Sequence, residues 1–307
     1  MVTLTGEASL IHTIHDKPPL DVDAVIKAIT VIQKESDNQS PFVESAEVRI
    51  NTQSPVLLVT MGDMHIGNQA TDHAKILEHL KIVRDTPNTF ITFMGDEVDN
   101  LYVFRKGGAE ETMSAEMQGL LVGQMVGELV KAGKVISLVR GNHNDFSDNF
   151  YRAFLEKQVP IFYNWGEVKL SIGTQEYKFA QFHEFTMGNS TMSHLLRELK
   201  VLEMRFPDAD IVAGAHTHRK SLEEVNINGK RRVLMETGTY KIKDGFQIGH
   251  GNARFGQFDF GGASVLLFPD TKRIIPFYDL EMGIEAVTGK LFLKQALMQG
   301  ASNVLRK

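Results

Sequence analysis

The chain has 307 residues, of which 42% are hydrophobic and 23% charged, and it carries a net charge of -5 and no cysteine. This composition is typical of a globular protein with a sizeable core, and it excludes disulfides, thiolate metal sites and cysteine nucleophiles. The negative net charge argues against binding of double-stranded nucleic acid through a general basic surface. The charge therefore allows a nucleic-acid partner but does not indicate one.

Residues 1–50 are predicted to form an N-terminal extension with one helix and a polar linker. Apolar residues recur at helical spacing from Val22 to Ile32, after a proline pair that suits a helix start. The polar stretch 34–45 predicts the linker. We expect the main domain to cover residues 51–282 and a C-terminal helical tail to cover residues 283–307.

From residue 55 onward, short apolar runs alternate with amphipathic segments, which is the pattern of an α/β protein. In the first predicted helix, Ile76, Leu77, Leu80 and Val83 share one face. The methionines also fall at helical spacing, which predicts core packing for them. The last three apolar runs predict mostly antiparallel strands, so the sheet is expected to be mixed. The predicted strands are 55–60, 89–94, 134–139, 176–182, 209–215, 231–240, 262–268 and 273–279.

Polar side chains follow five of these strands directly. Ligands of open α/β sheets bind outside the carboxyl ends of the strands, because the loops converge there. Histidine, carboxylate and amide oxygen delivered to one rim indicate a metal centre. Taken singly, each residue has an ordinary explanation as a turn residue, a helix cap or a core histidine. The clusters, in chain order, are Asp63 and His65; Asp96 and Asp99; Asn142, His143 and Asp145; His183; and His216 and His218.

The spacing of these residues suits a pair of divalent ions. Asp-x-His and His-x-His place two side chains on the same side of an extended segment, so both can grip one ion. Oxygen and imidazole donors suit hard or borderline dications, and one bridging carboxylate would hold two of them roughly 3.5–4 Å apart. A water between such ions becomes hydroxide near neutral pH, which supplies a nucleophile without any serine or cysteine.

In these residues the chain resembles the calcineurin-like metallophosphoesterases, whose ordered signature is D-x-H, G-D-x-x-D, G-N-H-[E/D], H and G-H-x-H. The resemblance covers about residues 55–270. It implies an α/β four-layer sandwich, with two mixed β-sheets flanked by helices, and two divalent ions that are manganese, iron or zinc. By resemblance, Asp63, His65 and His218 hold the first metal, Asn142, His183 and His216 hold the second, Asp96 bridges the two, and His143 is the general acid, oriented by Asp99.

The chain departs from the family pattern at several positions. Asn144 stands where an acidic residue usually follows Gly-Asn-His, and Glu184 follows His183 where glycine is common. Asn100 stands where protein phosphatases typically have an arginine, which weakens the interpretation of this chain as a protein phosphatase. The glycine-rich segment 238–256 is similar to a prokaryotic and phage-type branch. Within it, His250 and Arg254 are candidate substrate-binding residues, since guanidinium matches phosphate oxygens.

We therefore predict a two-metal phosphoesterase that acts on a phosphate monoester or diester. One alternative is a nuclease of the DNA-repair branch acting on DNA ends or single strands, but the coiled-coil heptads of that branch are missing. The other is a non-catalytic metal-binding scaffold, although all seven ligand positions and His143 are filled. We expect a cytoplasmic protein without a membrane partner, because no signal peptide or apolar run of ~18 residues is present. The oligomeric state stays open.

Overall fold

A computed structural model describes residues 43–100, 111–144, 159–185, 195–242 and 260–290, together with residues 23, 26–27 and 29–31. The chain divides into two compact units, Met1–Pro41 and Phe42–Lys307. In the first unit, the described residues are helical. In the described part of the chain, no helix is both long and apolar enough to cross a membrane. The last residues of the predicted C-terminal tail, from 291 onward, lie outside the described ranges.

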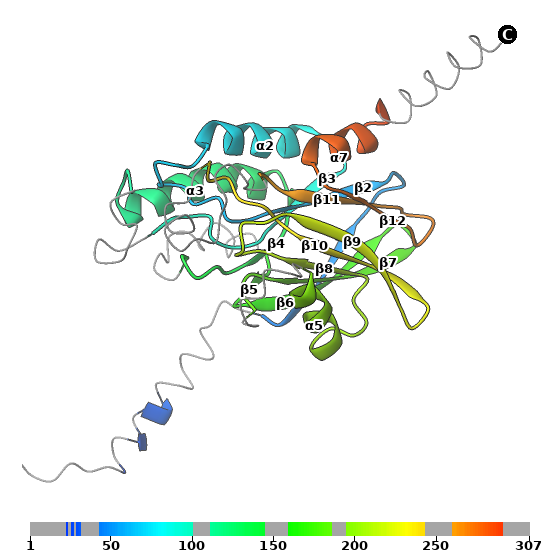
Figure 1. Ribbon diagram of the computed structural model, residues 1–307, viewed down its shortest axis with the longest axis horizontal. Coiled ribbons are helices and arrows are strands. Elements are labelled where there is room, and N and C mark those ends of the chain that lie inside the picture. The colour runs from blue at the N-terminus through cyan, green and yellow to red at the C-terminus, as the bar shows by residue number, and fades with distance from the viewer. Residues whose placement is uncertain are drawn as a thin grey trace, which may run out of the picture. The chain divides into compact units, whose positions relative to one another are not determined.

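The described part of the second unit contains two six-stranded mixed sheets, which we call sheet A and sheet B (Figure 1). Sheet A has the spatial order β12 (Ile274–Phe277), β11 (Ala263–Leu267), β2 (Val56–Met61), β3 (Thr89–Phe93), β4 (Val135–Val139) and β5 (Ile161–Phe162). Sheet B has the spatial order β1 (Ser45–Ile50), β6 (Trp165–Ile172), β7 (Gln175–Phe182), β8 (Ile211–Gly214), β10 (Lys230–Glu236) and β9 (Ser221–Ile227).

Strand direction sets where the loops meet. In sheet A, β2, β3, β4 and β5 run parallel, while β11 is antiparallel to β2. In sheet B, β7, β8 and β10 run parallel, while β6 and β9 are antiparallel to their neighbours β7 and β10. The loops that follow a set of parallel strands leave the sheet at the same edge, so each sheet presents one rim of adjacent loops.

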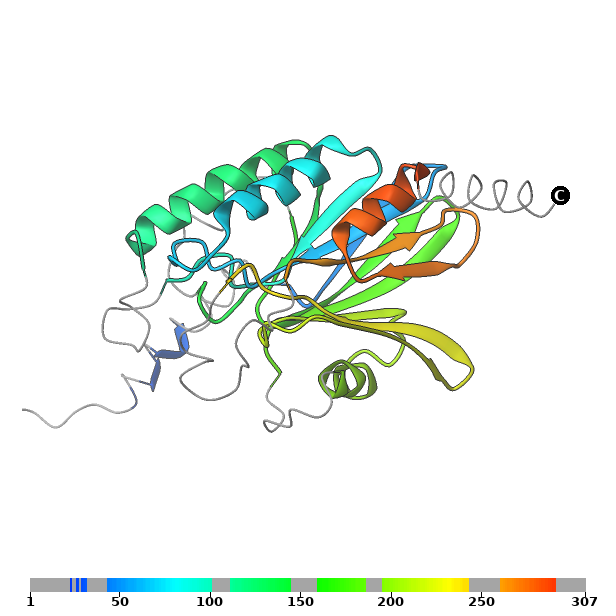
Figure 2. The same ribbon diagram turned by 45° about the horizontal axis from the view of Figure 1, so that its top comes forward.

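Four helices cover the outer faces of the sheets in the described residues. Contacts join α2 (His73–Asp85) to β3, α7 (Leu280–Val287) to β2 and β11, and α2 to α3 (Ala115–Lys131), so these three lie on sheet A (Figure 2). Sheet B is covered by α5 (Leu196–Met204), which contacts β8 and β10. Asp72 and Ser114 cap α2 and α3 by accepting backbone N–H groups of the first turn.

Three apolar clusters fill the spaces between these layers. One packs the inner faces of both sheets together and includes Leu58, Phe179 and Val265. A second lies between sheet A and its helices, and a third lies between sheet B and α5. Helix, sheet, sheet and helix therefore form four layers, which confirms the fold predicted from the resemblance.

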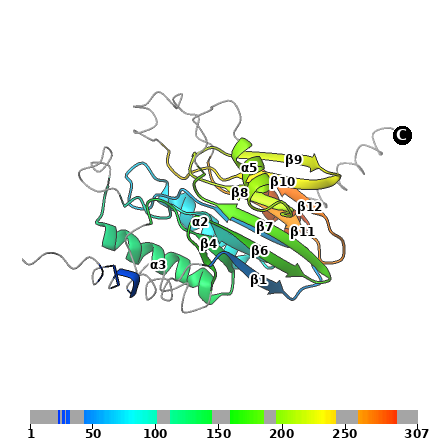
Figure 3. The ribbon, with the colours of Figure 1, turned by 90° about the horizontal axis from the view of Figure 1, so that it is seen from below.

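Several features differ from the sequence prediction. Four strands (β1, β5, β6 and β9) went unpredicted because they are very short or alternate polar with apolar residues. The segment 45–50, assigned to the extension, forms β1 and pairs in parallel with β6 at the edge of sheet B (Figure 3). Leu77 and Met117 were predicted to pack in the core, but they are 53% and 55% exposed because the buried faces of α2 and α3 are rotated away from them.

Two leucines test this placement of the core. Leu58→Ala should lower the free energy of unfolding by about 2–5 kcal/mol, because a side chain that is 1% exposed leaves a cavity between the sheets. Leu77→Ala is the matched control and should change it by only about 0.5 kcal/mol. Urea unfolding of both variants checks this. Equal losses of unfolding free energy in the two variants would mean that Leu77 lies on the buried face of α2.

Candidate metal centre

Residues from both sheets converge at the carboxyl ends of the strands. Sheet A supplies Asp63 and His65 after β2, Asp96 after β3 and Asn142 after β4. Sheet B supplies His183 after β7, and His216 and His218 after β8. The side chains from the two sheets meet in two clusters, so the centre lies where the two rims face each other.

The first cluster consists of Asp63, His65 and His218, whose ligand atoms all lie within 4.8 Å of one another. The Nε2 atoms of His65 and His218 are 3.0 Å apart. Asp63 Oδ1 is 3.6 Å from Nε2 of His218 and 4.0 Å from Nε2 of His65. One carboxylate and two imidazoles that point their free atoms at one place can hold a divalent ion.

The second cluster consists of Asp96, His183 and His216. Asp96 Oδ2 lies 3.1 Å from Nε2 of His183. The amide oxygen of Asn142 lies 3.0 Å from His183 Nε2 and 3.1 Å from His216 Nδ1, so it joins this cluster. The second cluster therefore offers one carboxylate, one amide oxygen and two imidazoles.

A buried carboxylate oxygen supports the fit to a cation. Asp63 Oδ2 accepts the backbone N–H of His216 at 2.8 Å, but Asp63 Oδ1 is buried and has no hydrogen-bond partner among the described residues. Burial raises the pKa of Asp63, with neighbouring His218 and His183 opposing the shift. An unsatisfied buried acceptor is costly. A cation held between Asp63 and its two histidines would remove that cost.

The charge states of two of the histidines also suit ion binding. Burial lowers the pKa of His65 and of His216 to about 3, so both imidazoles are neutral and have a lone pair to donate. Burial would lower the pKa of His183 as well, but Asp96 beside it raises this pKa to about 9. In turn, His183 and His143 hold the pKa of Asp96 well below its ordinary value against the effect of burial. The second cluster thus favours a positive charge.

The backbone is strained at the same place. Five of the seven predicted ligands have a positive φ, from 47° at His65 to 81° at His216. Non-glycine residues rarely adopt this conformation, and it concentrates at functional sites. The Asp-x-His spacing predicts an extended segment at Asp63 and His65. Instead β2 ends at Met61 and the chain turns sharply, which brings the two side chains together. The five residues are Asp63, His65, Asp96, His216 and His218.

The carboxylate of Asp99 contacts a different histidine from the one predicted for it. Its carboxylate contacts Nδ1 of His65 at 2.9 Å, and its other oxygen accepts from Asn68 at 2.9 Å. The Lys241 ammonium lies 3.5 Å from the same carboxylate. His143 Nδ1 instead faces the backbone carbonyl of Asp99. Asp99 therefore orients His143 through its peptide oxygen, while its charge acts on His65, because the turn after β3 directs the carboxylate toward the first cluster.

Two supporting networks went unpredicted. Asn144, which replaces the usual acidic residue, donates to the buried carboxylate of Glu97. The Glu236 carboxylate accepts from both Arg197 and Thr217, and Arg197 also donates to the carbonyl of Ala215 at 2.9 Å. The second network holds the residues on both sides of His216. No local pattern could reveal it, because its members come from three separate elements.

His250 and Arg254, the candidate substrate contacts, lie outside the described residues, as does Asp145. The other sequence-predicted site residues are all described. All seven predicted ligands lie in the two clusters, with Asn142 attached to the second through its amide oxygen. His143 lies beside both clusters: its Nε2 is 3.8 Å from Asp96 Oδ2, and its ring centroid is 4.9 Å from that of His65.

The Glu236 network predicts a pH effect on stability. Burial raises the pKa of Glu236 from 4.5 to about 7, with Arg197 opposing the shift. The folded state then binds a proton that the unfolded state releases, so the free energy of unfolding falls as pH rises from about 4.5 through about 7. Glu236→Gln keeps an oxygen that accepts hydrogen bonds but does not titrate. Its free energy of unfolding should therefore lack this fall with rising pH.

Urea unfolding of the wild type and of Glu236→Gln at about pH 5 and about pH 8 measures the effect. The unfolding free energy of the variant minus that of the wild type should increase with pH. A difference that stays constant across this range would show that Glu236 is ionised in the folded protein throughout.

Comparisons with known proteins identify structural neighbours only. No protein-family model matches the chain, and no curated protein matches it in sequence. Among solved structures, it is similar to a predicted phosphoesterase of Streptococcus pneumoniae (12% identity, TM-score 0.36, 73% of this chain and 99% of that chain). It is also similar to the zinc complex of vacuolar protein sorting 29 from Entamoeba histolytica (13% identity, TM-score 0.38, 73% of this chain and 100% of that chain). A third similar structure is that of the NAD nucleotidase of Haemophilus influenzae (12% identity, TM-score 0.37, 72% of this chain and 50% of that chain).

Proposed function

We propose that the protein hydrolyses a phosphate ester with the help of two divalent metal ions. The observation that supports this best is the pair of adjacent clusters, each with one carboxylate and two histidines, at the facing rims of the two sheets. Asp63, His65 and His218 would hold the first ion, and Asn142, His183 and His216 the second. Asp96 would be shared between them, since its carboxylate lies 3.1 Å from His183 of the second cluster and 3.8 Å from His143, whose ring packs against His65 of the first cluster.

Nitrogen and oxygen donors without thiolate suit manganese, iron or zinc. When bound, such a pair supplies a nucleophilic water at neutral pH and offsets the charge of the phosphate oxygens. The protein's part is to hold its ligands in one arrangement. Asp99 fixes the ring of His65 through Nδ1, and the carbonyl of Met94 does the same for His183 at 2.7 Å. Partners of this kind orient ligating histidines.

His143 has the features of a general acid. Its Nδ1 faces the carbonyl of Asp99, and because a carbonyl only accepts, this nitrogen carries a proton. Its Nε2 therefore faces the centre, 3.8 Å from Asp96, and can hold a second proton for the departing ester oxygen. The side chain is 18% exposed, so a substrate can reach it. His143 ligates neither ion in this scheme.

The assignment of Asp96 is testable through metal content. Asp96→Asn should lose activity and metal together, because a neutral amide neither bridges two ions well nor offsets their charge. The loss of metal affinity should exceed the about 10–100-fold that removal of an outer partner costs. Elemental analysis and titration calorimetry with manganese measure it, with Asp270→Asn on the exposed β11–β12 turn as the matched control. Two metals per chain and normal turnover in Asp96→Asn would refute the role.

The role of His143 is testable through the leaving group. His143→Ala should retain its metals and lose little rate on a nitrophenyl ester, whose leaving group departs without a proton. On an alkyl ester it should lose about 10²–10⁴-fold. The measurement is a plot of rate against leaving-group pKa, and the variant should show the steeper slope. Parallel lines for wild type and variant would rule out general-acid action.

Asp99→Asn separates the two histidines that Asp99 touches. Because its carboxylate holds His65 and only its peptide oxygen faces His143, the variant should lose about 10–100-fold in metal affinity. Its leaving-group slope should equal that of the wild type.

A further inference from the structure

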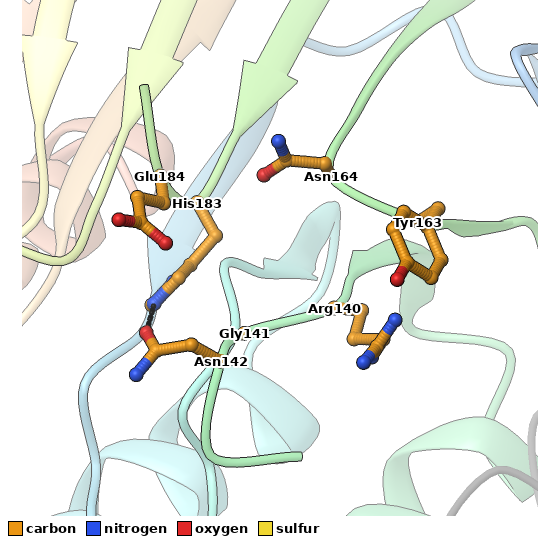
Figure 4. A pocket seen from close by; sticks show the side chains of 7 residues that line it. All are labelled: Arg140, Gly141, Asn142, Tyr163, Asn164, His183 and Glu184. Carbon is orange, nitrogen blue, oxygen red and sulfur yellow. Dashed lines mark hydrogen bonds between the residues drawn. The ribbon is translucent and has the colours of Figure 1, made fainter. Parts of the chain in front are cut away.

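A hollow of about 190 Å³ opens beside the second cluster (Figure 4). Asn142 and His183 form part of its lining, so it adjoins the place where the phosphate group would bind under the proposed function. The remaining side chains of the lining belong to Arg140, Tyr163, Asn164 and Glu184. None of these four belongs to either metal cluster.

The hollow is built where the chain crosses from one sheet to the other. Arg140 follows β4 of sheet A, Glu184 follows β7 of sheet B, and Tyr163 and Asn164 connect β5 to β6. Backbone bonds fix these walls: Arg140 donates to the carbonyl of Phe162 at 2.8 Å, and His183 donates to that of Asn164 at 3.2 Å. The segments that carry Asn142 and His183 of the second cluster therefore also form walls of the hollow.

The two walls differ in chemistry. On one side the Arg140 guanidinium lies 4.3 Å from the centroid of the Tyr163 ring, which is 59% exposed. On the facing side lies the carboxylate of Glu184, with the amide of Asn164 at the rim between them (Figure 4). A tyrosine ring and a guanidinium plane stack against flat aromatic groups. A carboxylate and an amide opposite them suit a ring that has hydrogen-bond donors and acceptors.

The position of His143 decides which part of a substrate would lie in the hollow. His143 does not line the hollow: its Nε2 lies 3.8 Å from Asp96, its Nδ1 faces the carbonyl of Asp99, and its ring packs on His65 of the first cluster, away from the lining. The departing oxygen must lie near His143, because that residue would protonate it. A group in the hollow, at the second cluster, is therefore the ester substituent that stays on phosphorus.

From this arrangement we infer that the hollow binds a nucleoside, and that the substrate is a nucleoside phosphodiester whose nucleoside remains on the phosphate product. This inference rests on the proposed function. Tyr163 and Arg140 stack the base, and Glu184 and Asn164 accept and donate hydrogen bonds at its edge or at the sugar. A short or single-stranded substrate agrees with the net charge of -5, which disfavours long duplex.

Two esters with the same leaving group test the hollow alone: thymidine 5′-(p-nitrophenyl phosphate) and ethyl p-nitrophenyl phosphate. In both, water adds its hydroxyl to phosphorus, the bond to the nitrophenol oxygen breaks, and that oxygen leaves with the electron pair while one proton is released. Tyr163→Ala should raise KM for the thymidine ester about tenfold, as expected for loss of one base–aromatic stack, and leave the ethyl ester nearly unchanged.

Tyr278→Ala is the matched control. This tyrosine is 40% exposed and stacks on Lys220 at 4.8 Å, but it does not line the hollow. It should leave KM for both esters unchanged. Equal effects of Tyr163→Ala on the two esters would overturn the assignment of the hollow, while hydrolysis of both by the wild type would leave the proposed function standing.

A binding measurement separates the two proposals when turnover is lacking. Calorimetry on the manganese-loaded protein should show thymidine 5′-monophosphate binding at least about fivefold more tightly than inorganic phosphate, with the difference lost in Tyr163→Ala. That result without hydrolysis of any ester would support the hollow and refute the proposed function. Equal affinity of the wild type for the two ligands would overturn the hollow.

Discussion

The burial of two carboxylates, Asp63 and Asp96, is the constraint on which the rest of this centre depends. A charged group removed from water is strongly destabilising unless it is paired or hydrogen-bonded. Here the compensation comes from backbone N–H groups and imidazoles: His216 and His143 each donate a backbone N–H to one of the carboxylates at 2.8 Å. Asp63 Oδ1 is left without a hydrogen bond among the described residues, which identifies the position where a cation fits best.

The loops that carry the ligands are held from behind by further buried carboxylates. Asp99 fixes His65, Glu97 fixes Asn144 and the N–H of Gly95, and Glu236 fixes Thr217. Strained positive-φ positions persist only where the surroundings over-determine them. These supporting carboxylates therefore explain how the ligand loops can keep a conformation that the backbone disfavours.

The sequence predicted which side chains gather at the strand ends, because polar residues that directly follow apolar strands leave a local signal. Asp63, Asp96 and His183 each follow a strongly apolar run, and the order of the motifs is itself informative. The parts that went unpredicted depend on contacts between distant segments. The bond from Thr217 to Glu236 and the choice between His65 and His143 as the partner of the Asp99 carboxylate are set by how loops turn in space. Strands such as β6, with half of their residues polar, give a weaker signal than the continuous apolar run of β2.

A protein with a negative net charge is expected to repel an anionic ester. The proposed site with its metals bound would remove this conflict. Association follows the local field of a cleft more than the net charge of the whole molecule. Two divalent ions against the charges of Asp63 and Asp96 would leave the centre positive, and the charge of Asp99 is already opposed by Lys241 at 3.5 Å. Arg140 would extend this positive region into the hollow, while Glu184 limits it on the facing side. The phosphate would thus be attracted to the metals, and discrimination between substrates would fall to the less charged surface beside them.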